Sequence, residues 1–131
     1  GAWTAHTVNT TIPAGGYFLI SFAKTSSGTA LPKIDLEGPT GTNLGQSSMV
    51  AVVEGTAKLP NGCPAEDAVV DFVGFGSSSC PSAFTIGTVA TNSAQRKGAG
   101  CTDTNVSNAD FELLAVSPRS SLTDPAICVC E

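Results

Sequence analysis

The chain has 131 residues and a formal net charge of −5; 41% of its residues are hydrophobic and only 13% are charged. This length suits one domain with a core of modest size. Because no run of Lys or Arg forms a basic face, and no apolar stretch approaches the roughly 20 residues of a membrane-spanning helix, we expect neither a nucleic-acid partner nor membrane insertion. Gly, Ser, Thr and Pro replace the missing charges, which is typical of many short strands joined by turns.

The first half of the chain contains two expected strands. Residues 13–16 predict a turn, and the apolar run at residues 17–22 predicts a buried strand directly after it. Residues 25–48 are loop-like, with Ser, Gly, Pro and Thr throughout. The sequence SMVAVVEG, residues 48–55, predicts the next strand, which ends at its glycine.

A third strand is expected at AVVDFVGFG, residues 68–76, after a turn at Asn61-Gly62. Asp71 is the one charged residue in this run, and both faces of the run are otherwise nearly apolar. We therefore expect the strand to lie in the centre of a sheet.

The second half of the chain is less regular. Residues 77–91 show no clear pattern, residues 93–97 predict a short strand, and residues 109–121 mix strand and turn signals, with Pro118 as a stop. The sequence AICVC, residues 126–130, alternates as a strand would. Nothing shows helical periodicity over about 11 residues. Together these patterns predict an all-β sandwich of the broad immunoglobulin-like class.

Five cysteines in a lysine-poor chain indicate disulfides and an oxidising compartment. Cys63 and Cys80 bracket the expected central strand, and a disulfide between them would join its two flanking loops. Cys101 would then pair with Cys128 or Cys130. The last two lie on one strand face about 7 Å apart, so they cannot both bond Cys101, and one is a candidate for an interchain bridge.

Two positions allow N-linked glycosylation. Asn9 and Asn105 each begin an Asn-X-Ser/Thr sequence. With the expected disulfides, these sequences favour a secreted or cell-surface protein.

The sequence offers little for catalysis. His6 is the only histidine, and no serine stands in a G-x-S-x-G setting, so a Ser-His-Asp triad has weak support. A carboxylate pair for glycoside hydrolysis is also disfavoured, because Asp71 in mid-strand fits a structural ion pair with Arg96 better. We expect no enzymatic activity.

Two metal sites are conceivable from the residue types. Zinc could use His6 with Cys128 and Cys130, but in an oxidising compartment disulfides are favoured over zinc. Calcium is a stronger option, although the spacing does not match an EF-hand and Asx-rich runs more often cap turns. We expect turn capping, with calcium as the alternative, from the oxygen-bearing set Asp103, Asn105, Asn108 and Asp110.

Four blocks follow one another along the second half: VVDFVGFG (69–76), NSAQRK (92–97), CTDTNVSNADF (101–111) and SPRSS (117–121). The series resembles the lamin tail domain of secreted bacterial and other extracellular proteins. Members of that family tend to read V-V-D-F-V-G-Y-G, T-S-x-Q-R-K, T-D-T-D-x-N-x-A-D-F and P-R-N-S. TIPAGGYFLI and NLGQSSMVAVVEG also resemble its strands, and the cysteine pair around V-V-D-F is familiar from it. The resemblance covers about residues 3–121.

This resemblance implies an immunoglobulin-like β-sandwich at residues 1–121 that serves structure and interaction and has no catalytic residues. A cysteine-containing, strand-like tail follows at residues 122–131. In lamins the domain lies behind a filament-forming rod, and in secreted bacterial proteins it often accompanies nuclease, phosphatase or other hydrolase domains. The structural signature of the family falls on Asp71, Arg96, Lys97, Asp103, Asp110, Phe111 and Arg119.

Two departures from the family pattern bear on function. The family's first strands, which precede the region of Trp3, are absent, so we expect copies of the chain or a companion chain to supply them. The tail AICVCE is not part of the pattern and adds two cysteines.

We therefore expect a non-catalytic structural subunit of an extracellular, fibre-like assembly, completed by strand exchange, an interchain disulfide or both. The alternative is an accessory or substrate-binding domain of a secreted hydrolase of the nuclease or phosphatase type. Calcium apart, we expect no cofactor.

Overall fold

A computed structural model describes residues 2–22, 29–38, 41–78, 80 and 91–129. Within these ranges the chain forms short strands, two single-turn 3₁₀ helices and one short α-helix. In chain order the elements are β1 (Ile20–Ser21), β2 (Leu36–Glu37), β3 (Ser48–Val52), η1 (Glu66–Ala68), β4 (Asp71–Phe75), β5 (Asn92–Arg96), η2 (Gly98–Gly100), α1 (Ser107–Asp110) and β6 (Phe111–Ala115).

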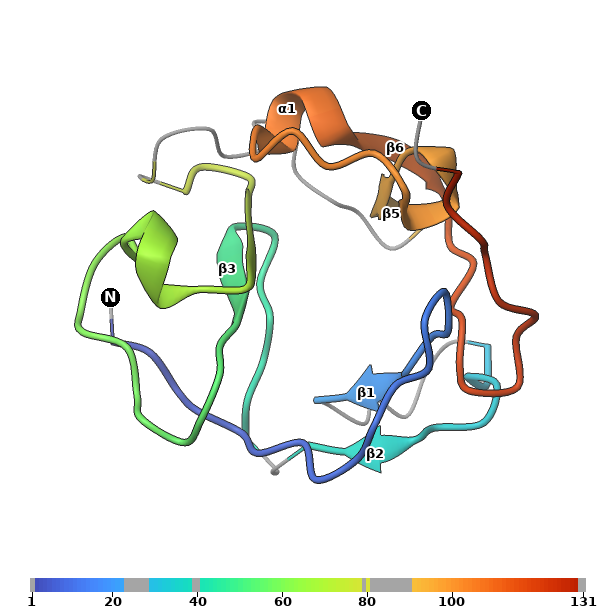
Figure 1. Cartoon of the computed structure of the whole chain (residues 1–131), viewed down its shortest axis with the longest axis horizontal. Helices are drawn as coiled ribbons and strands as arrows, with labels where there is room; N and C mark the ends of the chain where they lie inside the picture. Colours follow the sequence, from blue (N-terminus) through green and yellow to red (C-terminus); the bar gives the residue numbers. More distant parts are fainter. Residues whose placement is uncertain (1, 23–28, 39–40, 79, 81–90, 130–131) are drawn as a thin grey trace.

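The strands form three separate pairs. β1 and β2 are parallel, whereas β3 with β4 and β5 with β6 are antiparallel. In Figure 1, β1 and β2 lie at the bottom of the view, β3 lies at the left, and β5, β6 and α1 lie at the top. The described part of the chain is thus β-rich, with little helix.

The β3–β4 pair follows directly from its composition. Val50 lies opposite Val73 and Ala51 opposite Phe72, so β-branched and aromatic side chains face one another across the strands. Gly76 then turns the chain back against the start of β3 with φ +68°, where a Cβ would lie only 2.8 Å from Ser47 Cα. Only glycine fits this approach.

The expected central position of residues 68–76 is not seen. Among the described residues, β4 pairs with β3 alone. On β4, the Phe72 N–H donates to the Asp71 side chain at 2.8 Å. The Phe72 amide is therefore bonded to a carboxylate rather than to the carbonyl of a second neighbouring strand.

The expected buried strand at residues 17–22 is reduced to two residues. Its ladder is replaced at Leu19, whose N–H donates to the Asp35 carboxylate and whose carbonyl accepts from the N–H groups of Asp35 and Leu36. The Asp35 side chain and the backbone at the start of β2 therefore satisfy the polar backbone groups of Leu19.

The expected strand-like tail is also wrong over the residues that the structure describes, 122–129, because none of them is in a strand. The Ala126 N–H donates to the Gly15 carbonyl at 2.9 Å, which fixes the tail to the turn before β1. Ile127 and Val129 are highly exposed, so their alternation buries no face. Cys130 lies outside the described residues, as does most of the irregular stretch at 77–91.

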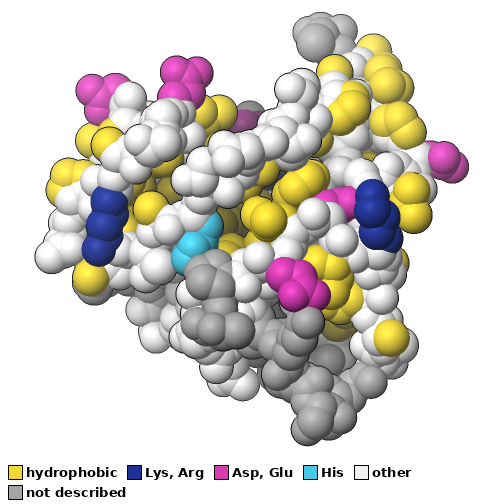
Figure 2. Space-filling view, turned by 90° about the horizontal axis from the view of Figure 1, so that it is seen from below, with side chains coloured by type: hydrophobic (Ala, Val, Ile, Leu, Met, Phe, Trp, Pro, Cys, Tyr) yellow, Lys and Arg dark blue, Asp and Glu magenta, His cyan; other side chains and the backbone are white. Residues whose placement is uncertain are grey.

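Burial in this molecule is more polar than in an ordinary domain. Among the described residues the one buried hydrophobic residue is Cys80, whereas Ser21, Ser107, Asp110 and Ser120 are buried polar residues. Other apolar side chains are half-buried or exposed, and Figure 2 shows several of them between polar groups on one face. The large hydrophobic residues that are exposed are Val8, Ile12, Leu31, Leu44, Val52, Val70, Val106, Leu114, Val116, Leu122, Ile127 and Val129.

Candidate functional site

A cluster of charged side chains surrounds Arg96, the last residue of β5. Its Nη2 lies 2.7 Å from both carboxylate oxygens of Asp71, and its Nη1 lies 3.0 Å from Asp103 and 3.6 Å from Asp110. The guanidinium group also covers the Phe111 ring at 4.8 Å. The structure therefore brings together five signature residues from β4, β5, α1, β6 and the loop before α1.

Asp110 is the buried member of this cluster. Its carboxylate accepts from the Thr104 N–H at 3.0 and 2.9 Å and from the Thr104 hydroxyl at 2.6 Å. Burial raises the pKa of Asp110, but the Thr104 hydrogen bonds and the charge of Arg96 outweigh burial and hold that pKa below its ordinary value. The side chain stays ionised and fixes the loop ahead of α1.

Lys97 completes the same framework from the next position. Its Nζ donates to the Ala109 carbonyl at 2.7 Å, and its backbone N–H donates to the Asp110 carbonyl at 2.8 Å. Lys97 and Arg96 thus hold the loop through both side chains and backbone.

The oxygen-bearing residues that were the alternative calcium ligands have a geometry that favours turn capping. Asp103 accepts from the Asn105 N–H at 3.3 Å, which is the Asx-turn arrangement, and Asn105 has the left-handed φ of 59°. Asp103 and Asp110 are both engaged by Arg96. Within the described ranges no group of three or more His, Cys, Asp or Glu side chains is placed to hold a metal ion.

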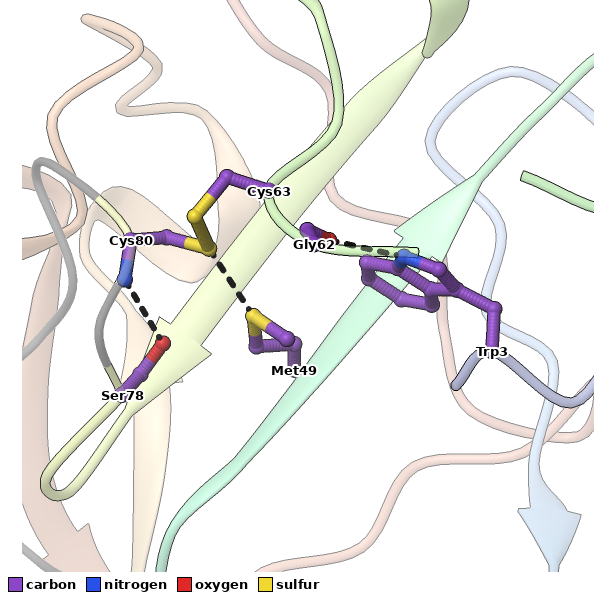
Figure 3. The surroundings of a disulfide bond; sticks show 6 residues. All are labelled: Trp3, Met49, Gly62, Cys63, Ser78 and Cys80. Atoms are coloured by element: carbon purple, nitrogen blue, oxygen red, sulfur yellow. Dashed lines mark hydrogen bonds between the residues drawn. A yellow bond between two sulfur atoms is a disulfide. The ribbon is translucent and has the colours of Figure 1, made fainter. Parts of the chain in front are cut away.

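Two disulfides connect distant loops. Cys63 bonds Cys80, and Cys101 bonds Cys128. Figure 3 shows the first beside Met49 of β3, whose Sδ lies 3.0 Å from Cys80 Sγ. The two bonds indicate an oxidising environment.

Trp3 packs close to the first disulfide. Its indole N–H donates to the Gly62 carbonyl at 3.0 Å, and its ring meets Phe72 of β4 edge-on at 6.4 Å. The residues ahead of β1 are therefore attached to the loop that carries Cys63.

His6, the candidate catalytic base, packs against an aromatic ring. The Nε2 of His6 is buried without a hydrogen-bond partner among the described residues, and the ring lies 5.4 Å from Phe22. The two glycosylation positions, Asn9 and Asn105, are both exposed, although Ser107 of the second sequence is buried.

The sequence did not predict one cluster of hydrogen bonds, the clamp that Asp35 forms on Leu19 and Ser121. Asp35 is almost fully buried and accepts from the N–H groups of Leu19 and Ser121, from the Ser121 hydroxyl, and from Lys33 at 3.2 Å. The Leu19 N–H and the Ser121 hydroxyl, more than the other donors, hold the pKa of Asp35 far below its ordinary value. Leu19 and Ser121 are about a hundred positions apart, so no local pattern signals this contact.

A second arrangement missed by the sequence interpretation is a shallow hollow around Arg119. The Arg119 guanidinium group covers the Tyr17 ring at 5.0 Å, and its Nη1 donates to the Tyr17 hydroxyl at 3.2 Å. That hydroxyl in turn donates to the Ala99 carbonyl at 3.0 Å. The hollow has a volume of about 240 Å³ and is lined by Tyr17, Gln95, Arg96, Gly100, Ser117 and Arg119.

Comparison of the chain with protein-family models, with curated proteins and with solved structures finds no match. The described part of the chain holds no helix long and apolar enough to cross a membrane. The resemblance to lamin tail domains stays a prediction from the sequence blocks.

Proposed function

We propose that the protein is a non-catalytic extracellular structural module that acts by associating with copies of itself. One observation carries this proposal. The chain exposes 8843 Å², whereas a compact monomer of 13.1 kDa exposes about 6,400 Å². This excess surface supports association with another copy, which would bury part of it.

The strand pairs support the same proposal. Isolated two-stranded sheets are at best marginally stable in water, and an unpaired strand edge is a template for another strand. In the described ranges each of the three sheets has only two strands, so every strand has one unpaired edge. A strand from a neighbouring copy would extend any of these sheets, and head-to-tail addition would produce a fibre.

The proposal also includes an immunoglobulin-like sandwich as the fold of the assembled protein. The lamin-tail blocks coincide with β4, with β5, with the segment from Cys101 to β6, and with Arg119. In the proposed assembly these pairs belong to an immunoglobulin-like sandwich that strands of another copy complete. The two disulfides support placement outside the cell or at its surface.

Sedimentation velocity tests the association. We expect dimers or larger species at micromolar concentration, some of them covalent on non-reducing gels. A Cys130→Ser variant separates covalent from non-covalent contacts and should remove only the covalent fraction. A chain that sediments as a monomer at every concentration, with and without reductant, would contradict the proposal.

A paired substitution probes the apolar surface. Val52 and Val70 are exposed neighbours, since the Val70 N–H donates to the Val52 carbonyl at 2.7 Å. Replacing both with Lys should weaken association about tenfold by placing charge in a buried interface. The control is Thr56→Lys, which adds one of the two positive charges at an exposed polar position nearby. Equal association of both variants would exclude this surface.

The hollow around Arg119 favours a second function, that of an accessory or substrate-binding domain attached to a secreted hydrolase. A shallow site with an arginine and an aromatic ring suits ligand capture rather than reaction. Binding without turnover of the ligand would support this function, and a folded protein that binds no ligand there would remove it.

A further inference from the structure

The hollow around Arg119 contains a positive charge that the described residues do not neutralise. Arg96 has three carboxylates within 4 Å. In contrast, no ion pair joins Arg119 to any carboxylate in the ranges that the structure describes. Its contacts there are the ring and hydroxyl of Tyr17.

The Arg119 side chain is held in place before any ligand arrives. The Tyr17 hydroxyl accepts from Arg119 Nη1 and donates to the Ala99 carbonyl. These two hydrogen bonds together fix the position of the phenol. The Tyr17 ring centroid also lies 5.0 Å from the central carbon of the guanidinium group, within the range of a cation–π contact. This leaves Nε and Nη2 as donors, and a planar fork of this kind matches a carboxylate group.

The other lining groups add hydrogen-bonding capacity beside this charge. Gln95 uses its amide nitrogen on Ser93 Oγ and on the Ala115 carbonyl, which leaves its Oε1 as an acceptor. Ser117 has an exposed hydroxyl on the rim. At Gly100 no atom lies within 4 Å of the position of a Cβ, so the hollow is open on that side.

Size and charge restrict the ligand. The volume of about 240 Å³ is below the roughly 300–1,000 Å³ of sites for drug-sized ligands, so the hollow suits one ring of a ligand, with the rest of the ligand outside it. The net charge of −5 disfavours anionic ligands in general, so a carboxylate must be recognised locally by Arg119. A ligand with one carboxylate per ring and several hydroxyl groups matches the fork, the free amide oxygen and the serine hydroxyl together.

We propose that this hollow binds the carboxylate-bearing ring of an acidic sugar, with Arg119 on the carboxylate and Gln95 Oε1 on a neighbouring sugar hydroxyl. The site does not depend on self-association, because its lining residues come from one chain.

Titration calorimetry with trigalacturonate tests the proposal, with its neutral methyl ester as the matched ligand. The acid should bind, and the ester should bind at least tenfold more weakly. Equal binding of acid and ester would overturn the role of the charge. Sodium acetate and an acidic peptide serve as other carboxylate sources, and binding of either as tight as that of trigalacturonate would overturn the sugar assignment.

Two variants with matched charge locate the site. Arg119→Gln should weaken binding of trigalacturonate at least tenfold, while Lys58→Gln removes one exposed positive charge elsewhere and should change it less than twofold. Arg119→Lys keeps the charge and loses the fork, so it should bind several-fold more weakly even if Arg119→Gln fails to fold. Unchanged binding in a folded Arg119 variant would overturn the proposal. Sedimentation of the same samples reports self-association separately.

Discussion

Arg96 is the residue on which the loop between β5 and β6 depends. It is only 13% exposed, and it meets one nearly buried carboxylate, Asp110, and two that are about half exposed. Ion pairs at the surface contribute little, whereas removing one partner of a buried hydrogen-bonded charge is costly. The contribution of this cluster to stability should therefore lie mainly with Asp110.

Asp110→Asn provides the first prediction. The amide carries no charge, and its NH₂ group would replace the oxygen that accepts from the Thr104 N–H at 2.9 Å and lies 3.6 Å from Arg96 Nη1. We expect the free energy of unfolding in urea to fall by about 1–3 kcal/mol. The control is Asp103→Asn at the exposed end of the cluster, with an expected loss under about 1 kcal/mol. Equal losses in the two variants would show that burial does not determine how much each carboxylate contributes to stability.

A second prediction concerns acid. Asp35 and Asp110 have lowered pKa values in the folded chain, against an ordinary value of 3.8. The unfolded chain therefore binds more protons in acid, so the stabilisation from both groups is complete well above pH 4 and is lost as the pH falls below it. Urea unfolding at pH 7, 4 and 2.5 should show this decline.

Asp35→Asn is the informative comparison for the acid experiment. The variant should be less stable than the parent at pH 7, and it should lose less stability between pH 4 and pH 2.5. An unchanged pH profile would mean that the clamp on Leu19 and Ser121 does not hold the charged form.

At the scale of elements, the turn after β4 is set by close backbone approach. Gly76 and Gly55 both have positive φ, of +68° and +79°, but only Gly76 faces neighbouring backbone at its Cβ position. Gly55→Ala should cost about 1 kcal/mol for the conformation alone, and Gly76→Ala should cost 1–3 kcal/mol more because the chain must move. Thermal unfolding of both variants measures the difference; equal costs would exclude the packing term.

Elements defined by local pattern were predictable, and those defined by distant side chains were not. The alternating β-branched runs predicted β3 and β4, and the short run at residues 93–97 predicted β5. β1 is shorter than predicted because the carboxylate of Asp35, 16 positions away, takes the Leu19 N–H.

The same reasoning applies to the sites. The ion pair of Asp71 with Arg96 was expected, because both residues lie in predicted strands. The hollow was not, because Tyr17 and Arg119 are 102 positions apart and neither belongs to a recognisable motif with the other. The tail was misread because alternation is a sign of a strand only when one face becomes buried, and Ile127 and Val129 are not buried.

For the whole molecule, exposed apolar area should make stability depend on concentration. If copies associate in the folded state, the melting temperature should rise by about 5 °C over a hundredfold increase in protein concentration. The Val52→Lys, Val70→Lys double variant should need about tenfold more protein to reach the same melting temperature, and Thr56→Lys should behave like the parent. A melting temperature independent of concentration would indicate that the exposed surface is stable without a partner.

The disulfides also determine how the chain responds to pulling. The Cys101–Cys128 bond closes 27 positions and the Cys63–Cys80 bond closes 17. At roughly 3.4 Å per residue, these segments withhold about 90 and 60 Å of contour length. Under tension the load passes through the sulfur atoms instead of through β4, α1 and β6. A subunit built in this way limits its own extension, and a reducing environment would release that length.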